Sequence, residues 1–254
     1  MHVEVYSTAH TVREEDLAGK AVAVIDVLRA GSTIVTALHN GARSVIPVAD
    51  MGAAGRLAGH LDPDVGLLGG ERGGARIEGY QAGNSPLEYT AEAVAGRTVV
   101  LNTTNGTGAL VKASQAGFLT AACFLNADAV AARLRHEASE NNREVVLVCA
   151  GSEGRAALED MLCAGYLLEQ IWQGKEPASS PDGAHIAFSL FKQDRTRLQK
   201  AVLRCNHAQH LAFLGFEADV RYCLQTNAVP VVPVYGDSRL TLEGPKKKRR
   251  VAVG

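Results

Sequence analysis

The chain contains few aromatic residues and lacks the motifs of the common zinc and redox sites. Phe, Trp and Tyr make up 5% of its 254 residues, so we expect an aliphatic core, which suits helices packed on a buried parallel sheet. No CxxC pair occurs among the five cysteines, which we interpret as small buried residues in a reducing cytosol. No HExxH motif accompanies His207 and His210, so structural or solvent-facing roles are predicted for both.

Membrane-spanning and nucleotide-binding signals are also missing. No apolar run is long enough to cross a membrane, and residues 1–6 resemble a short strand rather than a signal peptide, so we expect a cytoplasmic protein. There is no GxxxxGK[ST] motif. The sequence Gly106-Thr107-Gly108 does not complete GxGxxG because residue 111 is valine. A nucleotide-dependent oxidoreductase is therefore the weakest of the functions considered.

Basic residues are concentrated near the C-terminus. Residues 246–250 hold five of the 26 basic groups, and without them 21 basic residues face 27 acidic ones, a balance of -6. The body of the protein is therefore not expected to bind nucleic acid. We interpret residues 241–254 as a basic, disordered and solvated tail.

Apolar strands alternate with helices through residue 174. The expected strands are 20–27, 44–48, 65–68, 97–101, 118–124 and 144–149, and the expected helices are 32–40, 52–60, 107–116, 127–140 and 155–172. This alternation predicts an α/β protein with three α/β/α layers and a mostly parallel sheet. Residues 1–174 would form the core. Residues 175–240 would form a more helical part with two late strands, 218–224 and 229–235, in the same or a second domain.

Four polar clusters interrupt the apolar chain at or near the ends of strands. They are residues 26–33, 70–74, 83–89 and 102–107. Because open parallel sheets bind ligands at the carboxyl ends of their strands, we expect the clusters to form one site. Their carboxylates, arginines, hydroxyls and backbone N–H groups suit a divalent metal and a phosphate.

The first cluster begins with Asp26 inside an apolar run. A carboxylate there is costly to bury unless it is paired or binds a metal, so we expect a metal-binding or catalytic role rather than a cap or a pair with Arg29. Arg29 can hold phosphate oxygens in a bidentate manner. Ser32 and Thr33 would lie at a helix N-terminus, which favours anions, and Ser32 can equally be an N-cap.

The other clusters give weaker individual signals. Glu71 and Arg72, enclosed by glycine pairs, would by themselves indicate a solvated turn, and Asn84 with Ser85 suits a plain turn. A second candidate anion cradle comprises Thr103, Thr104, Asn105 and Gly106. Residues 149–154 leave another strand, and the helix behind them carries Glu159 and Asp160, of which we favour Asp160.

Together these motifs resemble the 2-phosphosulfolactate phosphatase (ComB) family. The shared motifs are Asp-Val-Leu-Arg-Ala, Glu-Arg-Gly-Gly, Gly-Asn-Ser-Pro, Thr-Thr-Asn-Gly-Thr and Cys-Ala-Gly with Leu-Glu-Asp. They correspond here to residues 26–33, 71–74, 83–86, 103–107, and 149–151 with 158–160. The resemblance spans about residues 1–235. It favours functional roles for Glu71 and Arg72 over their interpretation as a solvated turn.

The resemblance implies a magnesium-dependent phosphatase acting on the phosphate ester of a 2-hydroxycarboxylic acid. The substrate would be 2-phosphosulfolactate, the products sulfolactate and phosphate, and the pathway coenzyme M biosynthesis. Expected catalytic residues are Asp26, Arg29, Glu71 and Arg72. Asp26 would hold Mg²⁺ together with Glu71 or Asp160. The substrate would be bound by Ser32, Thr33, Asn84, Ser85, Thr103, Thr104, Asn105 and Gly106.

Three points stay open at the level of sequence. The attacking oxygen can come from water or from Asp26. A non-catalytic binding protein for a phosphorylated or sulfonated metabolite is the alternative function, because it would need the same arginines and anion cradles. A homodimer is compatible with the chain, with residues 184–214 as the candidate interface.

Overall fold

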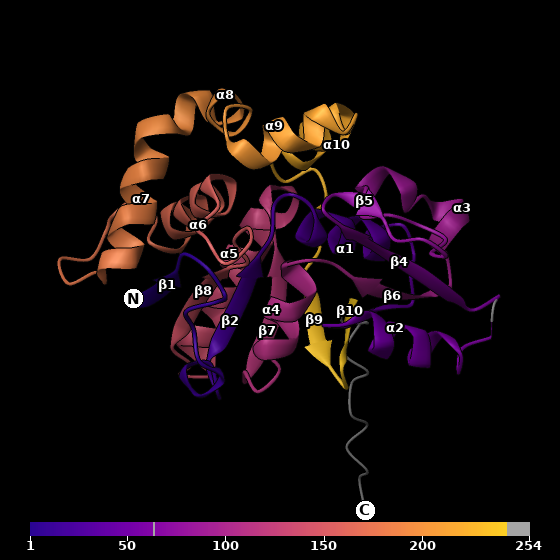
Figure 1. Ribbon diagram of the computed structural model, residues 1–254. Helices are drawn as coiled ribbons and strands as arrows, with labels where there is room; N and C mark the ends of the chain where they lie inside the picture. The colour runs from indigo at the N-terminus through magenta and orange to yellow at the C-terminus, as the bar shows by residue number, and fades with distance from the viewer. Residues whose placement is uncertain (63, 243–254) are drawn as a thin grey trace, which may run out of the picture.

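The computed structural model describes residues 1–62 and 64–242 (Figure 1). The part of the predicted basic tail from residue 243 onward lies outside these residues. The strands are β1 (Val3–Tyr6), β2 (Ala21–Ile25), β3 (Ser44–Pro47), β4 (Gly66–Arg72), β5 (Ala75–Arg76), β6 (Thr98–Asn102), β7 (Phe118–Ala122), β8 (Val145–Cys149), β9 (Pro233–Gly236) and β10 (Arg239–Leu242).

The α-helices lie mostly between and after these strands. They are α1 (Ala30–His39), α2 (Met51–Ala58), α3 (Ala91–Val94), α4 (Gly106–Lys112), α5 (Ala127–Glu140), α6 (Leu158–Ile171), α7 (Asp182–Asp194), α8 (Leu198–Val202), α9 (Asn206–Phe213) and α10 (Glu217–Cys223). Short 3-10 helices are η1 (Glu14–Asp16), η2 (Pro86–Glu88), η3 (Phe124–Asn126) and η4 (Arg195–Arg197).

The strands form two sheets rather than one. Sheet A is entirely parallel, in the order β1-β8-β2-β7, and sheet B is mixed, in the order β5-β4-β6-β3-β10-β9. In sheet A, Ile25 at the end of β2 is level with Cys149 of β8 and Ala122 of β7. The carboxyl ends of these strands therefore open at one edge, where the polar segments that follow them meet.

Alternating side chains of β2 separate the helices into layers. Ala21, Ala23 and Ile25 belong to an apolar cluster with α5, α6 and α7, whereas Val22 and Val24 belong to a second cluster with α1 and α4. This alternation is the period of two that places successive strand residues on opposite faces. The second cluster also contains residues of sheet B, so both sheets pack on α1 and α4.

The fold class predicted from the sequence is confirmed. The chain is α/β, with a parallel sheet A, a mixed sheet B and helices on both faces, consistent with three α/β/α layers. Helices α7, α9 and α10 share an apolar cluster with sheet A, and β10 pairs with β3. Whether residues 175–240 form a separate domain stays a prediction.

One late strand was predicted at the wrong place. Residues 218–224 lie in or directly after helix α10, in which Asp219, Val220 and Cys223 are buried. A spacing of three or four residues between buried positions is helical rather than extended. The two late strands are instead β9 and β10, which pair with each other and connect to β3.

The predicted loop around Glu71 is also more regular than expected. Strand β4 continues through Arg72, and Gly73 and Gly74 turn the chain into β5. Both glycines have positive φ, 58° and 88°. Positive φ at both central residues is the geometry of a tight two-residue hairpin, which explains the Gly-Gly pair.

No helix among the described residues is long and apolar enough to cross a membrane. The cytoplasmic location stays a prediction.

The packing of α6 against α7 depends on Gly165. A Cβ atom at this position would overlap the carbonyl oxygen of Ala187 and lie 2.5 Å from Cβ of Phe191. We expect Gly165→Ala to lower the free energy of unfolding by about 1–3 kcal/mol, because the two helices must separate. The measurement is urea unfolding monitored by circular dichroism.

Gly55 in α2 provides the matched control, because it is exposed and a Cβ there meets no atom within 4 Å. Gly55→Ala should raise the free energy of unfolding by about 0.5–1 kcal/mol through the better helix propensity of alanine. Equal effects of the two substitutions would contradict the packing role of Gly165.

Candidate active site

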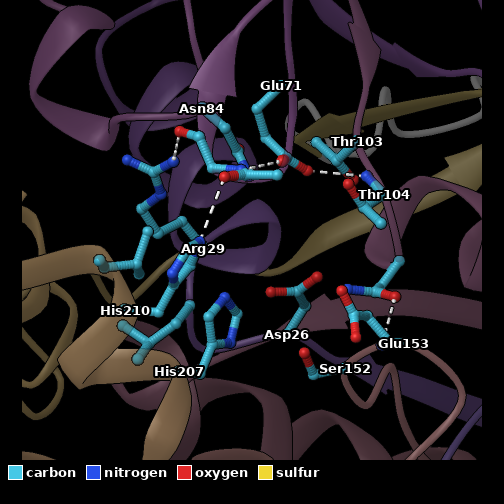
Figure 2. Close-up of a pocket in the computed structure, with 15 residues that line it drawn as sticks. Asp26, Arg29, Glu71, Asn84, Thr103, Thr104, Ser152, Glu153, His207 and His210 are labelled. Atoms are coloured by element: carbon cyan, nitrogen blue, oxygen red, sulfur yellow. Dashed lines mark hydrogen bonds between the residues drawn. The ribbon is translucent and has the colours of Figure 1, made fainter. Parts of the chain in front are cut away.

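A pocket opens where the strands of both sheets end, and helix α9 closes one side of it (Figure 2). It is lined by Asp26, Leu28, Arg29, Glu71, Gly73, Gly74, Asn84, Thr103, Thr104, Asn105, Ser152, Glu153, His207, His210 and Leu211. All four polar clusters found in the sequence contribute to this lining. The expectation that they meet at the carboxyl ends of the strands is therefore confirmed.

Asp26 follows β2 directly and projects into the pocket (Figure 2). Its Oδ1 accepts a hydrogen bond of 3.1 Å from the backbone N–H of Ala30. Burial raises the pKa of Asp26 to about 6, although the charge of His207 and the Ala30 N–H act in the opposite direction. A carboxyl group with this pKa can exchange a proton near neutral pH.

Gly106 is required beside Asp26 for steric reasons. A Cβ atom at position 106 would overlap Oδ2 of Asp26 and lie 2.7 Å from Cβ of Ala30. The close approach of α4 to the carboxylate therefore depends on the missing side chain, rather than on a nucleotide-binding glycine pattern. Gly106 itself is not among the lining residues of the pocket.

Glu71 points into the same pocket from β4. Its Oε1 accepts the backbone N–H of Thr104 at 2.7 Å, and its Oε2 accepts the backbone N–H of Gly74 at 2.8 Å. These bonds fix the orientation of the carboxylate. They also occupy the Thr104 N–H, which therefore is not available to donate a hydrogen bond to a bound anion.

Arg72 lies on the other face of β4. Consecutive strand residues point in opposite directions, so Glu71 and Arg72 cannot both enter the pocket. The Arg72 guanidinium donates to Oδ1 of Asn102 at 2.6 Å and to the Glu71 carbonyl at 2.7 Å, and it does not line the pocket. The structure thus places Arg72 away from the position expected for a catalytic arginine.

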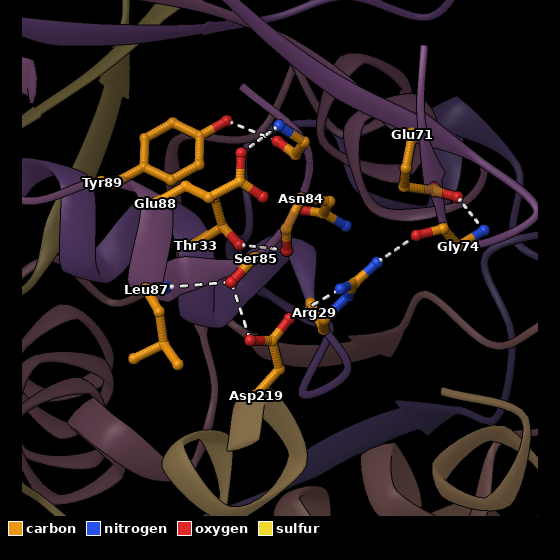
Figure 3. A network of polar contacts seen from close by, with 11 residues as sticks. Arg29, Thr33, Glu71, Gly74, Asn84, Ser85, Leu87, Glu88, Tyr89 and Asp219 are labelled. Carbon is orange, nitrogen blue, oxygen red and sulfur yellow. Dashed lines mark hydrogen bonds and ion pairs between the residues drawn. The ribbon is translucent and has the colours of Figure 1, made fainter. Parts of the chain in front are cut away.

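Arg29 forms a buried ion pair in the pocket wall (Figure 3). Its Nη1 donates to Oδ2 of Asp219 at 2.7 Å, its Nη2 donates to the carbonyl of Gly74 at 2.7 Å, and its guanidinium lies 4.3 Å from the ring centre of Phe216. Ser85 donates to the second oxygen of Asp219 at 2.7 Å. Ser85 therefore supports the ion pair instead of lining the pocket.

Ser32 and Thr33 also hold the walls together. Helix α1 begins at Ala30, so Ser32 lies inside the helix and is not its N-cap. Ser32 donates to the carbonyl of Val27 at 2.9 Å, and Thr33 donates to the carbonyl of Asn84 at 2.9 Å. Neither residue lines the pocket, whereas Asn84 does, with a buried Oδ1 that has no hydrogen-bond partner in the described chain.

Residues 103–105 face the pocket as predicted. Thr103 and Thr107 exchange hydrogen bonds between their hydroxyls and backbone groups across the start of α4. Oδ1 of Asn105 accepts the backbone N–H of Glu153 at 3.2 Å and so connects the ends of β6 and β8. Their roles in substrate binding stay predictions.

Asp160 does not line the pocket. Its Oδ1 accepts the N–H of Val27 at 2.9 Å and its Oδ2 accepts the N–H of Gly151 at 3.0 Å, so it clamps the ends of β2 and β8 together. Burial and the nearby carboxylates Asp26 and Glu159 raise the pKa of Asp160. Asp160 therefore lies behind the site, whereas Glu71, whose oxygens also accept backbone N–H groups, is among the lining residues.

Histidines contribute more to the pocket than the sequence suggested. His207 and His210 both line it from α9, and Nδ1 of His207 lies 2.8 Å from Oε1 of Glu159. Burial lowers the pKa of His207, but the hydrogen bond and charge of Glu159 outweigh it, so the pKa is raised. The spacing of three residues between the histidines was the available signal.

Ser152 and Glu153 also line the pocket. They belong to the segment that follows β8 in the sequence.

Asp219 was missed because its segment was predicted to be a strand, and no local motif marks it. Glu159 was ranked below Asp160, although it is Glu159 that contacts a pocket residue.

The donor set suits a hard cation. Carboxylates of Asp26 and Glu71 face the pocket, and Mg²⁺ commonly uses one or two carboxylates together with waters and substrate phosphate. Within the described residues no group of three or more His, Cys, Asp or Glu side chains is arranged as a complete protein metal site.

A family model described as 2-phosphosulpholactate phosphatase matches residues 6–238 of the chain. The chain belongs to this family. It is 39% identical over 233 residues to a protein of Caldanaerobacter subterraneus subsp. tengcongensis named "Probable 2-phosphosulfolactate phosphatase", with 92% of this chain and 95% of the relative covered. The enzyme class expected from the sequence, a phosphoric monoester hydrolase, is confirmed by this membership.

Two further relatives carry the same printed name. The protein of Caldicellulosiruptor saccharolyticus is 41% identical over 236 residues, covering 91% of this chain and 96% of the relative. The protein of Pseudothermotoga lettingae is 42% identical over 224 residues, covering 87% and 92%. The residues matched by the family model, 6–238, include every residue that lines the pocket.

The raised pKa of Asp26 predicts a dependence of stability on pH. Folding raises this pKa from 3.8 to about 6, so the folded state binds more protons than the unfolded state within that window. The stability contributed by the protonated group is therefore lost as the pH rises through about 6. In EDTA at pH 8, Asp26→Asn should raise the free energy of unfolding by about 1–3 kcal/mol.

At pH 4 the same substitution should change stability little, because Asp26 is then protonated in the folded protein. Urea unfolding of both proteins at the two pH values tests this. A difference that does not change with pH would contradict the burial effect.

The ion pair of Arg29 and Asp219 predicts a large effect on stability. Both side chains are almost completely buried, at 2% and 4% exposed. Asp219→Ala leaves Arg29 buried without its counter-charge and should lower the free energy of unfolding by about 3–5 kcal/mol.

Asp194→Ala breaks an ion pair with Arg197, whose side chain is 59% exposed, and is the matched control. Its expected cost is about 0–1 kcal/mol, measured by the same urea unfolding. Similar costs at the two positions would show that the buried pair does not hold the pocket wall.

Proposed function

We propose that this protein is a magnesium-dependent phosphatase that hydrolyses the phosphate ester of a 2-hydroxycarboxylic acid. The proposed substrate is 2-phosphosulfolactate, and the products are sulfolactate and phosphate. The observation that carries the proposal is the buried Asp26 carboxylate at the end of β2, which lines the pocket together with the Glu71 carboxylate.

The balance of charge in the pocket supports a requirement for a cation. Asp26, Glu71 and Glu153 line the pocket, while the charge of Arg29 is already paired with Asp219. A phosphate dianion entering beside these carboxylates would be repelled unless a cation accompanied it. Asp26 and Glu71 would hold Mg²⁺, and the ion would supply positive charge against the phosphoryl oxygens.

The residues of the chain would bind and orient the substrate. Asn84, Thr103 and Thr104 line the pocket, and amide N–H and hydroxyl groups of this kind can donate hydrogen bonds to substrate oxygens. Arg29 lies at the same wall and has N–H groups beyond those bonded to Asp219 and Gly74. Such positioning and charge stabilisation account for most of the catalysis in phosphoryl transfer.

Two routes are available to the attacking oxygen. Asp26 can accept a proton from water as the water attacks phosphorus, or its carboxylate can attack and form a phosphoenzyme. Trapping a phosphorylated Asp26 by rapid quench would identify the second route. That the reaction belongs to coenzyme M biosynthesis stays a prediction. The homodimer stays a prediction as well.

Phosphate release from a panel of 2-phospho-hydroxy acids, with Mg²⁺ and with EDTA, tests the proposal. We expect release with Mg²⁺, the fastest from 2-phosphosulfolactate, and loss of release with EDTA. Metal-independent binding without release from any member would favour the non-catalytic binding protein instead.

Asp26→Asn should lower kcat by about 100-fold or more, because the group can neither accept a proton nor attack phosphorus. The control is Asp237→Asn on the exposed turn between β9 and β10, which should retain full turnover. Turnover like that of the wild type in a folded Asp26→Asn protein would eliminate Asp26 as the central catalytic group.

A further inference from the structure

A histidine–carboxylate pair lies in the pocket wall beside Asp26 (Figure 2). His207 lines the pocket from α9, and its Nδ1 lies 2.8 Å from Oε1 of Glu159 on α6. Glu159 is 1% exposed, and its Oε2 is buried without a hydrogen-bond partner in the described chain. The Cys205 thiol, at the N-cap of α9, lies beside the same carboxylate, but of the two partners it is His207 that lines the pocket.

The contact with Glu159 determines which ring nitrogen serves the pocket. A carboxylate at Nδ1 fixes the proton on that nitrogen and sets the orientation of the imidazole. Nε2, on the opposite side of the ring, then remains for a ligand. Figure 2 shows the His207 ring beside the Asp26 carboxylate, and the charges of the two groups affect each other.

His207 and His210, the other histidine of the pocket, differ in the contacts that their ring nitrogens make. Nε2 of His210 lies 3.3 Å from the carbonyl oxygen of Gly73, so this nitrogen is directed toward the β4–β5 hairpin. His210 is also exposed, whereas the side chain of His207 is 22% exposed. Only His207 combines a buried carboxylate partner with a place beside Asp26.

The proposed reaction needs a proton donor. Hydrolysis of the ester breaks the bond between phosphorus and the ester oxygen, and the electron pair stays on that oxygen. An alkoxide is a poor leaving group, so a proton delivered to the oxygen as the bond breaks lowers the barrier. A histidine that is oriented by a carboxylate at one ring nitrogen and that lines the pocket is suited to this step.

We propose that His207 is the general acid of the reaction, donating the proton on Nε2 to the ester oxygen, with Glu159 as its positioning residue. The inference rests on the phosphatase function proposed above. As the alcohol leaves with the proton, His207 becomes neutral with its remaining proton on Nδ1 facing Glu159, and it is reprotonated from solvent. The step is the same whether water or Asp26 attacks phosphorus.

A comparison of two substrates distinguishes proton donation by His207 from its other contributions to the reaction rate. The first is 2-phosphosulfolactate, and the second is its analogue with sulfur in place of the bridging ester oxygen. The analogue has the same charges and nearly the same shape, but its thiolate leaves without a proton. Single-turnover rate constants with the full-length protein and Mg²⁺ report the chemical step directly.

For His207→Gln we expect a loss of about 100- to 10,000-fold on the oxygen ester and a change within about tenfold on the sulfur analogue. Glu159→Gln should show a smaller loss with the same sparing of the sulfur analogue. His207→Asn is the second variant if His207→Gln does not fold, as judged by circular dichroism.

The control substitutes His185, which forms a similar histidine–carboxylate pair with Glu176. Nδ1 of His185 lies 2.9 Å from Oε1 of Glu176, and the His185 side chain is 63% exposed. His185→Gln should leave both rate constants unchanged.

Equal losses on both substrates, or no loss on the oxygen ester, would overturn the acid role of His207 while the phosphatase function stands. If the wild type releases no phosphate from the oxygen ester, the proposed function is contradicted, and this inference with it.

Discussion

The buried ion pair between Arg29 and Asp219 joins the helical end of the chain to the strands that form the pocket. Arg29 follows β2, Asp219 lies on α10, and 190 residues of sequence separate them. Ser85 and the carbonyl of Gly74 bind the same pair, so segments from both sheets meet at it. Because a buried charge is costly without its partner, this contact holds α10 in place, and α9, which carries His207, packs against α10.

The pocket carries more negative than positive charge once that pair is counted. Asp26 and Glu71 face the space in which a phosphate would bind, and the pKa of Asp26 is raised by burial. Such an arrangement stabilises an anionic substrate only together with a cation. The proposed acid, His207, lies on α9, whereas Asp26 follows β2, so the two proton-transfer groups come from different elements.

The candidate site was predictable where polar residues follow apolar strands. Asp26 and the segment 103–105 were identified in this way, Glu71 and Asn84 were assigned to the site through the family resemblance, and all of them line the pocket. Prediction failed where direction or packing decided the outcome. Arg72 is adjacent to Glu71, yet the period of two in β4 turns it to the opposite face, where it binds Asn102. Asp160 is turned toward the backbone of Val27, and Glu159 contacts His207 instead.

The sequence by itself determined the fold class, most strand and helix positions before residue 174, the family and the polar clusters of the site. These features depend on local hydrophobic periodicity and on short motifs, both of which can be read within a few residues. Only the tertiary structure decided that residues 217–223 form a helix, that Asp219 pairs with Arg29, and that His207 faces Asp26. These contacts join segments far apart in the chain, and their formation depends on packing and burial, which no local pattern encodes.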